Sequence, residues 1–193
     1  MPTGGRKAGW KLHLPLIAEA ELALREPAAA GQLPDPAEAE RRVRRALEER
    51  GAPPQLVSFY TWKARAALEL ARAAASGGVA REPAERVIRR LRRARLSSLP
   101  ALLSILSREG LGWLLPDPET LLGWLRAAGG TRAAVLLALA DGRARPLPEL
   151  AGEVAALLGR PIGPRALAAR LSELRDLGLV ERAGGGWRIK RPS

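Results

Sequence analysis

The segment at residues 163–190 reads GPRALAARLSELRDLGLVERAGGGWRIK, and it decides the fold expected for the C-terminal third of the chain. Its Gly-Pro start is typical of a helix N-terminus, because proline is favoured at the first helical position. Leu167, Leu171 and Leu174 recur at i, i+4 and i+7, which places them on one buried stripe. Gly178 follows where a left-handed residue commonly ends a helix. A helix is therefore predicted from 164 to 177.

Two short extended stretches complete this segment. They cover residues 179–182 and 187–190, and the Ala-Gly-Gly-Gly between them indicates a hairpin turn. Upstream, apolar helical patterns cover residues 132–140 and 149–158, each closed by a glycine. The predicted order is helix, helix, helix, hairpin. A domain boundary is expected near residues 129–130.

The outward face of the predicted helix combines small residues with arginines. Alanines allow close approach to a groove, and an arginine can fork onto guanine O6 and N7 or onto a phosphate. The candidate DNA-reading residues on this helix are Arg165, Ala169, Ser172 and Arg175. The backbone N–H groups at the helix N-terminus also favour a phosphate.

The predicted hairpin adds a basic flap beside that helix. Arg182, Arg188 and Lys190 lie on its strands, where they are candidates to grip the sugar–phosphate backbone. Trp187 is interpreted as the anchor that packs the flap against the helices, in preference to a base-stacking residue.

Residues 131–191 resemble a winged helix-turn-helix domain. The resemblance rests on Pro-Glu-Leu-Ala at 148–151 and on Leu-x-x-Leu-x-x-x-Gly-Leu-Val-x-Arg at 171–182, followed by a glycine-rich turn. The link at 159–163 is longer than the tight turn of simple helix-turn-helix proteins. The resemblance implies the DNA-binding fold of many bacterial regulators and replication initiators. It also leaves a protein–protein role open, because winged helices serve as interaction modules as well.

The rest of the chain contains residues typical of helix starts and helix ends. Residues 1–12 are glycine-rich and basic, and they are expected to form a flexible arm. Residues 13–129 are expected to form an all-helical domain, since helical patterns succeed one another without a β alternation. Asp35-Pro36-Ala37-Glu38, for example, offers an N-cap, a proline at the first position and an acid in the first turn. The expected architecture is mainly α, with an N-terminal helical domain and a C-terminal winged helix at 130–193.

The net charge of +12 is concentrated in two segments. Residues 131–193 carry +5, and residues 81–95, with seven arginines and two glutamates, carry another +5. In the second segment an apolar face (Ala84, Val87, Ile88, Leu91) leaves arginines outside, and the candidate contacts are Arg86, Arg89, Arg90 and Arg93. Pairs of Glu82 with Arg86 and of Glu85 with Arg89 at i, i+4 would brace a solvated face. Such pairs use only two arginines, so nucleic-acid contact and a solvated face both stay open.

Several classes of site are disfavoured by residue content. The chain has no cysteine and one histidine, His13, so it offers neither a thiolate nor a multi-histidine metal site. Its glycine stretches match neither a phosphate-binding loop nor a dinucleotide fingerprint. Asp117 and Glu119 are interpreted as helix-capping acids. No catalytic residue, metal or cofactor is expected. The longest aliphatic run, 135–140, is too short for a bilayer, and a cytoplasmic protein is expected.

From these features we expect a non-enzymatic, double-stranded DNA-binding protein that reads DNA with the helix at 164–177 and the wing at 179–190. A transcriptional regulator and a plasmid or phage replication initiation factor are both compatible with the pattern. A homodimer, or association with other replication or transcription proteins, is expected. Two alternatives stay open: a structural subunit of a larger nucleoprotein complex that uses the winged helix for protein contact, and an RNA-binding helical protein.

Overall fold

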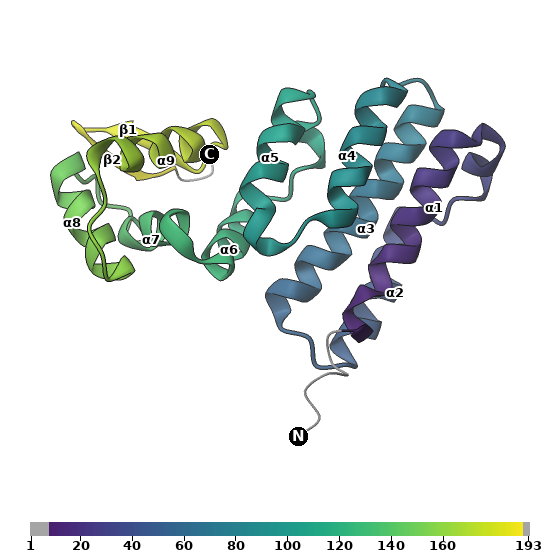
Figure 1. The fold of residues 1–193 in the computed structure, drawn as a ribbon, viewed down its shortest axis with the longest axis horizontal. Coiled ribbons are helices and arrows are strands. Elements are labelled where there is room, and N and C mark those ends of the chain that lie inside the picture. Colours follow the sequence, from purple (N-terminus) through teal and green to yellow (C-terminus); the bar gives the residue numbers. More distant parts are fainter. Residues whose placement is uncertain (1–7, 191–193) are drawn as a thin grey trace. The chain divides into compact units, whose positions relative to one another are not determined.

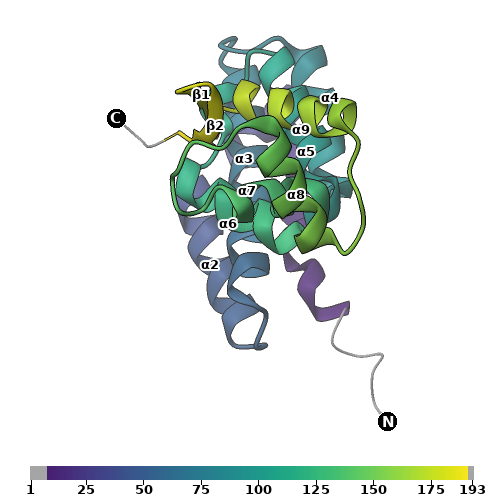
Figure 2. The ribbon, with the colours of Figure 1, turned by 90° about the vertical axis from the view of Figure 1, so that its left-hand side faces the viewer.

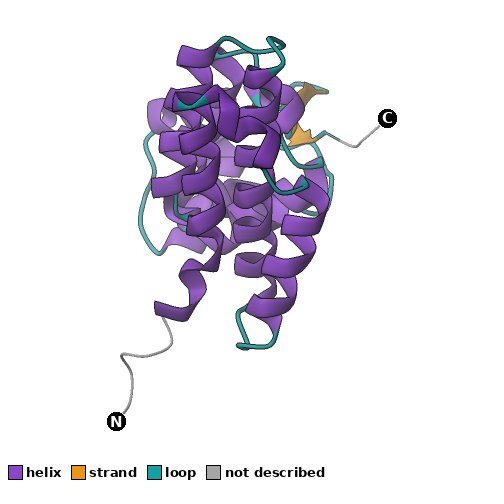
Figure 3. Cartoon of the chain, turned by 90° about the vertical axis from the view of Figure 1, so that its right-hand side faces the viewer, coloured by secondary structure: helices purple, strands orange, loops and turns teal. Residues whose placement is uncertain are grey.

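The protein is mainly α-helical and carries a two-stranded antiparallel hairpin near its C-terminus (Figures 1 and 3). The computed structural model describes residues 8–190. The chain divides into two compact units between Leu115 and Pro116. Within residues 8–190, no helix combines the length and apolarity needed to cross a bilayer.

The first unit is built around one long helix. Its α-helices are α1 (Leu14–Arg25), α2 (Pro36–Glu48), α3 (Pro54–Ala75), α4 (Arg81–Arg93) and α5 (Leu99–Arg108). Short 3₁₀ helices cover Ala8–His13, Pro27–Gln32, Leu96–Ser98 and Gly112–Leu114. α3 packs against α1, α2 and α4, and α4 packs in turn against α5. The many alanines of α3 explain its central position, because small side chains let neighbouring helices approach on several sides. Six of the ten residues buried on α3 are Ala64, Ala66, Ala67, Ala71, Leu68 and Leu70.

Two predicted helix starts are confirmed. The carboxylate of Asp35 accepts a hydrogen bond from the Glu38 N–H at 3.0 Å, and that of Asp117 accepts one from the Thr120 N–H at 2.9 Å. Each aspartate thereby satisfies an N–H that has no partner inside the first turn. The hydrogen bonds from Thr120 also hold the pKa of Asp117 below its usual value.

The N-terminal segment differs from the expected flexible arm. Residues 1–7 of that arm lie outside the described part of the chain, but residues 8–12 belong to a 3₁₀ helix that continues to His13. Trp10 and Leu12 pack against a core cluster that includes Val43 and Leu47. Burial of these two apolar side chains favours the packed position of this segment over a fully solvated one.

A polar cluster lies buried between this segment and α3. The Lys63 side chain is 1% exposed, and its Nζ donates to the Ala94 carbonyl at 2.7 Å. His13 Nδ1 donates to the Trp10 carbonyl at 3.1 Å, which leaves Nε2 as an acceptor 3.3 Å from Lys63 Nζ. The imidazole stacks on Tyr60 with the ring centroids 4.4 Å apart. Burial, reinforced by the charge of Lys63, lowers the pKa of His13 to about 4, and burial lowers the pKa of Lys63 to about 8.

The second unit contains the predicted order of elements with one more helix in front. It consists of α6 (Pro118–Ala128), α7 (Gly130–Ala138), α8 (Leu147–Leu158), α9 (Pro164–Asp176) and the strands β1 (Val180–Ala183) and β2 (Gly186–Ile189). α7 packs against α6, α8 and α9, and α9 packs against β1 (Figure 2). α6, which the sequence placed in the N-terminal domain, is therefore part of this compact unit. The predicted domain boundary at 129–130 stays a prediction.

The hairpin is fastened to the loop before α8. Gly184 and Gly185 form its turn with φ values of +56° and +78°, a backbone region that favours glycine. Arg145, in that loop, pairs with β2: its N–H donates to the Trp187 carbonyl at 2.9 Å, and the Trp187 N–H donates back at 2.8 Å. A Cβ on Gly186 would lie 2.6 Å from the Arg145 backbone, so this position requires glycine.

Candidate nucleic-acid interface

α9 presents the predicted face to solvent. Leu167, Leu171 and Leu174 are all fully buried, which confirms the predicted stripe and turns the opposite face outward. On that face the predicted contacts Arg165, Ala169 and Arg175 are exposed, and Ser172 is half-buried. The N-cap residue of α9 is Gly163, which has no side chain to cap the first backbone N–H groups of the helix.

The arginines of this face have few carboxylate partners within the described chain. Arg165 has none, and Arg175 has only long contacts of 3.4 Å with Asp176 and with the Ser172 hydroxyl. The nearby Glu173 is occupied by Arg132, at 2.7 Å, and by Arg170. The outward face therefore retains positive charge.

The hairpin is more self-contained than its sequence suggests. Arg188 lies opposite Glu181 in the register, and the two form an ion pair at 2.7 Å. The Arg182 guanidinium lies 4.9 Å from the centroid of the Trp187 ring. Trp187 is 6% exposed, which confirms its interpretation as a packing anchor. Lys190 is exposed and has no ion-pair partner among residues 8–190.

Arg145 positions the hairpin, and sequence reasoning missed it. Its side chain is 10% exposed and forms ion pairs with Asp141 at 2.7 Å and with Glu153 at 2.8 Å. These hydrogen bonds raise the pKa of Arg145 and lower that of Asp141. Asp141 at i−4 and Glu153 at i+8 could have indicated the ion pairs of this side chain. No local pattern indicates that the Arg145 backbone pairs with β2.

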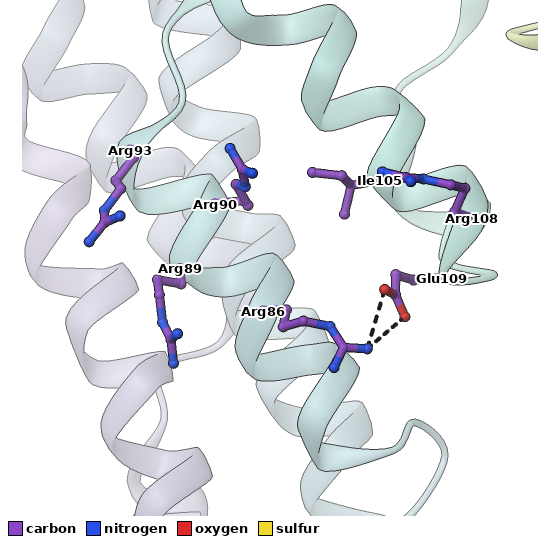
Figure 4. A pocket seen from close by; sticks show the side chains of 7 residues that line it. All are labelled: Arg86, Arg89, Arg90, Arg93, Ile105, Arg108 and Glu109. Carbon is purple, nitrogen blue, oxygen red and sulfur yellow. Dashed lines mark hydrogen bonds and ion pairs between the residues drawn. The ribbon is translucent and has the colours of Figure 1, made fainter.

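The second predicted set lies in the first unit, on α4. Ala84, Val87, Ile88 and Leu91 are fully buried, as predicted, so the arginines face outward. A groove of about 520 Å³ follows this face between α4 and α5, and its arginines are Arg86, Arg89, Arg90, Arg93 and Arg108 (Figure 4). Ile105 and Glu109 of the α5 region also line it. Arg108 is an addition that the sequence pattern of α4 could not supply.

The ion pairs predicted on α4 are present. Arg86 contacts Glu82 at 3.1 Å, and Arg89 contacts Glu85 at 3.0 Å. Arg86 also contacts Glu109 at 3.2 Å, an interaction drawn in Figure 4. The predicted residues thus form two sets, one on α4 in the first unit and one on α9 and the hairpin in the second.

Comparison with protein-family models, with curated proteins and with solved structures finds no match to this chain. The chemistry of the two arginine-bearing surfaces is therefore the basis for the functional proposal.

Proposed function

We propose that this chain is a non-enzymatic double-stranded DNA-binding protein whose C-terminal unit acts as a winged helix-turn-helix module. The order α7, an extended segment at Arg145, α8, α9 and the hairpin supports this resemblance. The module would serve a transcriptional regulator or a plasmid or phage replication initiation factor.

The outward face of α9 is the observation that carries the proposal. Arg165 and Arg175 are separated by ten residues, or about 15 Å along a helix, and exposed alanines lie between them. A major groove about 12 Å wide accepts a helix of this kind, and small side chains let its backbone approach the base edges. Arg165 and Arg175 would read bases, with Ser172 between them.

The hairpin would grip the backbone in the proposed complex. Lys190 is available for a phosphate, whereas Arg188 must first leave Glu181 or share its charge with it. Arg182 is held over Trp187 and would act by shaping the strand as well as by its charge. The proposal therefore assigns sequence reading to α9 and sequence-independent affinity to the hairpin.

Selection of bound sequences from a random duplex pool, followed by affinity measurements on the winner and a scrambled duplex, tests this function. Replacing both Arg165 and Arg175 by alanine is expected to lower affinity for the winner at least tenfold, because each good arginine–base contact contributes about 1–3 kcal/mol of discrimination. Affinity for the scrambled duplex should change much less. A palindromic winner would indicate a twofold-symmetric dimer.

Two further variants separate reading from gripping. Arg188→Ala is expected to weaken all duplexes alike, and Glu181→Gln to strengthen them, since it releases Arg188. The matched control, Arg126→Ala with Arg143→Ala, also removes two positive charges from the second unit, but outside α9, and it should preserve selectivity. Unchanged selectivity in the Arg165/Arg175 variant would refute DNA reading by α9 and favour a protein-docking role for the module.

A further inference from the structure

The groove between α4 and α5 holds arginines that have no ion-pair partner in the described part of the chain. Arg90, Arg93 and Arg108 are exposed, and no carboxylate of residues 8–190 lies within ion-pair distance of any of them. By contrast, Arg86 and Arg89 are engaged by glutamates. Two arginines of the groove are therefore ion-paired within the described chain, whereas the charges of Arg90, Arg93 and Arg108 are available to an external anion.

The burial of one face of α4 determines where its arginines lie. The buried face of the helix leaves positions 86, 89, 90 and 93 on one exposed side, where like charges three and four residues apart repel one another. Arg108 joins them from α5 and adds to the repulsion. Glutamates compensate Arg86 and Arg89, and a bound polyanion would compensate the charges of Arg90, Arg93 and Arg108.

The lining points to phosphate groups in preference to bases. The described lining residues include no aromatic ring for stacking, and no amide or hydroxyl for reading base edges. Guanidinium forks match the geometry of phosphate oxygens, with charge-assisted hydrogen bonds. Ile105 is the single apolar side chain among these lining residues, which is too little to bury a ring.

The guanidinium groups are strung out along the helix. Figure 4 shows Arg86 and Arg90 on the edge of α4 next to α5, and Arg89 and Arg93 on its other edge. Positions 86 to 93 span about 10 Å at the rise of an α-helix. A compact anion could contact only part of this row, whereas a chain of phosphates could follow it.

We propose that the α4–α5 groove is a second nucleic-acid site that binds consecutive phosphates of a phosphodiester backbone, without regard to sequence or sugar, through Arg90, Arg93 and Arg108. The inference rests on the proposed function for the kind of polymer but uses different residues in a different unit. Glu109, which holds Arg86 at 3.2 Å, competes with the phosphates for that arginine and limits the affinity of the groove.

The test uses the full chain and measures affinity for a random-sequence duplex, for polythymidine and for polyuridine between about 50 and 200 mM salt. Replacing Arg90, Arg93 and Arg108 together by alanine should reduce the slope of log K against log salt by about 2.7 for the duplex and about 2 for the single strands, as expected for three lost phosphate contacts. Glu109→Gln should tighten binding to all three polymers.

The matched control replaces Arg41, Arg42 and Arg45 of α2, three exposed arginines, and so changes the net charge equally. Circular dichroism of each variant verifies that the helices persist. If the groove variant and the control variant have equal slopes on all three polymers, the proposal is wrong. It is also wrong if tripolyphosphate binding depends on the three groove arginines while binding of all three polymers does not, since the site would then take a free phosphate chain.

The two proposals, sequence reading by α9 and phosphate binding by the groove, can be refuted independently. An unchanged preference for the selected over the scrambled duplex in the Arg165/Arg175 variant would refute sequence reading by α9, and it would leave the groove proposal untouched. A salt slope of the groove variant equal to that of the control variant would refute the groove site, whatever the sequence preference.

Discussion

At the scale of single residues, Lys63 is a charged side chain that is almost completely buried. A buried ammonium is costly unless hydrogen bonds satisfy it, and here the Ala94 carbonyl and the His13 imidazole accept those bonds. The Phe59 and Tyr60 rings lie 5.5 Å from Nζ and add an attractive face. The ammonium thus ties the N-terminal segment, α3 and the end of α4 together, provided that His13 stays neutral.

Stability should therefore fall in mild acid. His13 has a pKa of about 4 in the folded protein and an ordinary value of 6.5, so between these values the unfolded state holds a proton that the folded state does not. The free energy of unfolding should decrease as the pH falls through this window, by about 2 kcal/mol between pH 7 and pH 5 from this residue alone. Urea unfolding at the two pH values measures the loss.

His13→Gln supplies the comparison, since glutamine does not titrate and the carboxylates common to both proteins cancel. The variant should lose about 2 kcal/mol less than the parent protein between pH 7 and pH 5. Parallel pH profiles would show that His13 is not held neutral by the fold. Lys63 acts in a separate window: its pKa of about 8 against an ordinary 10.5 means that its contribution to stability rises with pH between those values.

At the scale of elements, contacts between distant segments decide where helices end. The basic segment at 81–95 has one apolar face throughout its middle, but the helix α4 runs only from Arg81 to Arg93. Pro83 is accommodated inside the first turn because the first four N–H groups of a helix have no intrahelical partner. At the other end Ala94 is extended, with ψ of 136°, and its carbonyl accepts from Lys63.

The hairpin offers a sharp test of close backbone approach. Gly186→Ala would place a Cβ 2.6 Å from the Arg145 backbone and should destabilise the second unit by about 1–3 kcal/mol, as overpacking usually does. Thermal unfolding measures the effect.

Gly152→Ala in α8 is the matched control, because a Cβ there meets nothing within 4 Å. It should stabilise the protein by about 0.5–1 kcal/mol, since alanine is the better helix former. Equal effects of the two substitutions would mean that the strand pairing between Arg145 and Trp187 does not constrain the hairpin.

At the scale of the whole molecule, the two compact units carry one proposed binding surface each. A fragment of residues 116–193 contains α6 together with α7, on which α6 packs, whereas a fragment of residues 130–193 follows the boundary predicted from sequence and lacks α6. The longer fragment should unfold cooperatively at the higher temperature, because it retains the buried face of α6 with Leu121, Trp124 and Leu125. Circular dichroism melting compares the two, and an equal midpoint would support the boundary at 129–130.

The sequence by itself determined the buried stripes of α4 and α9, the aspartate caps of α2 and α6 and the presence of the hairpin. The leucine spacing in α9, Asp35 at the N-cap of α2 and the paired glycines of the hairpin turn are signals that act within a few residues, so local periodicity and turn chemistry suffice to find them. Even the i, i+4 ion pairs on α4 were predictable in this way.

Only the tertiary structure decided which charges remain available. Arg108 joins the arginines of α4 because α5 packs beside it, Glu109 holds Arg86 across the groove, and Arg145 fastens the hairpin from the loop before α8. These partners lie far apart in sequence, and their meeting depends on how helix surfaces pack, which a local pattern does not encode.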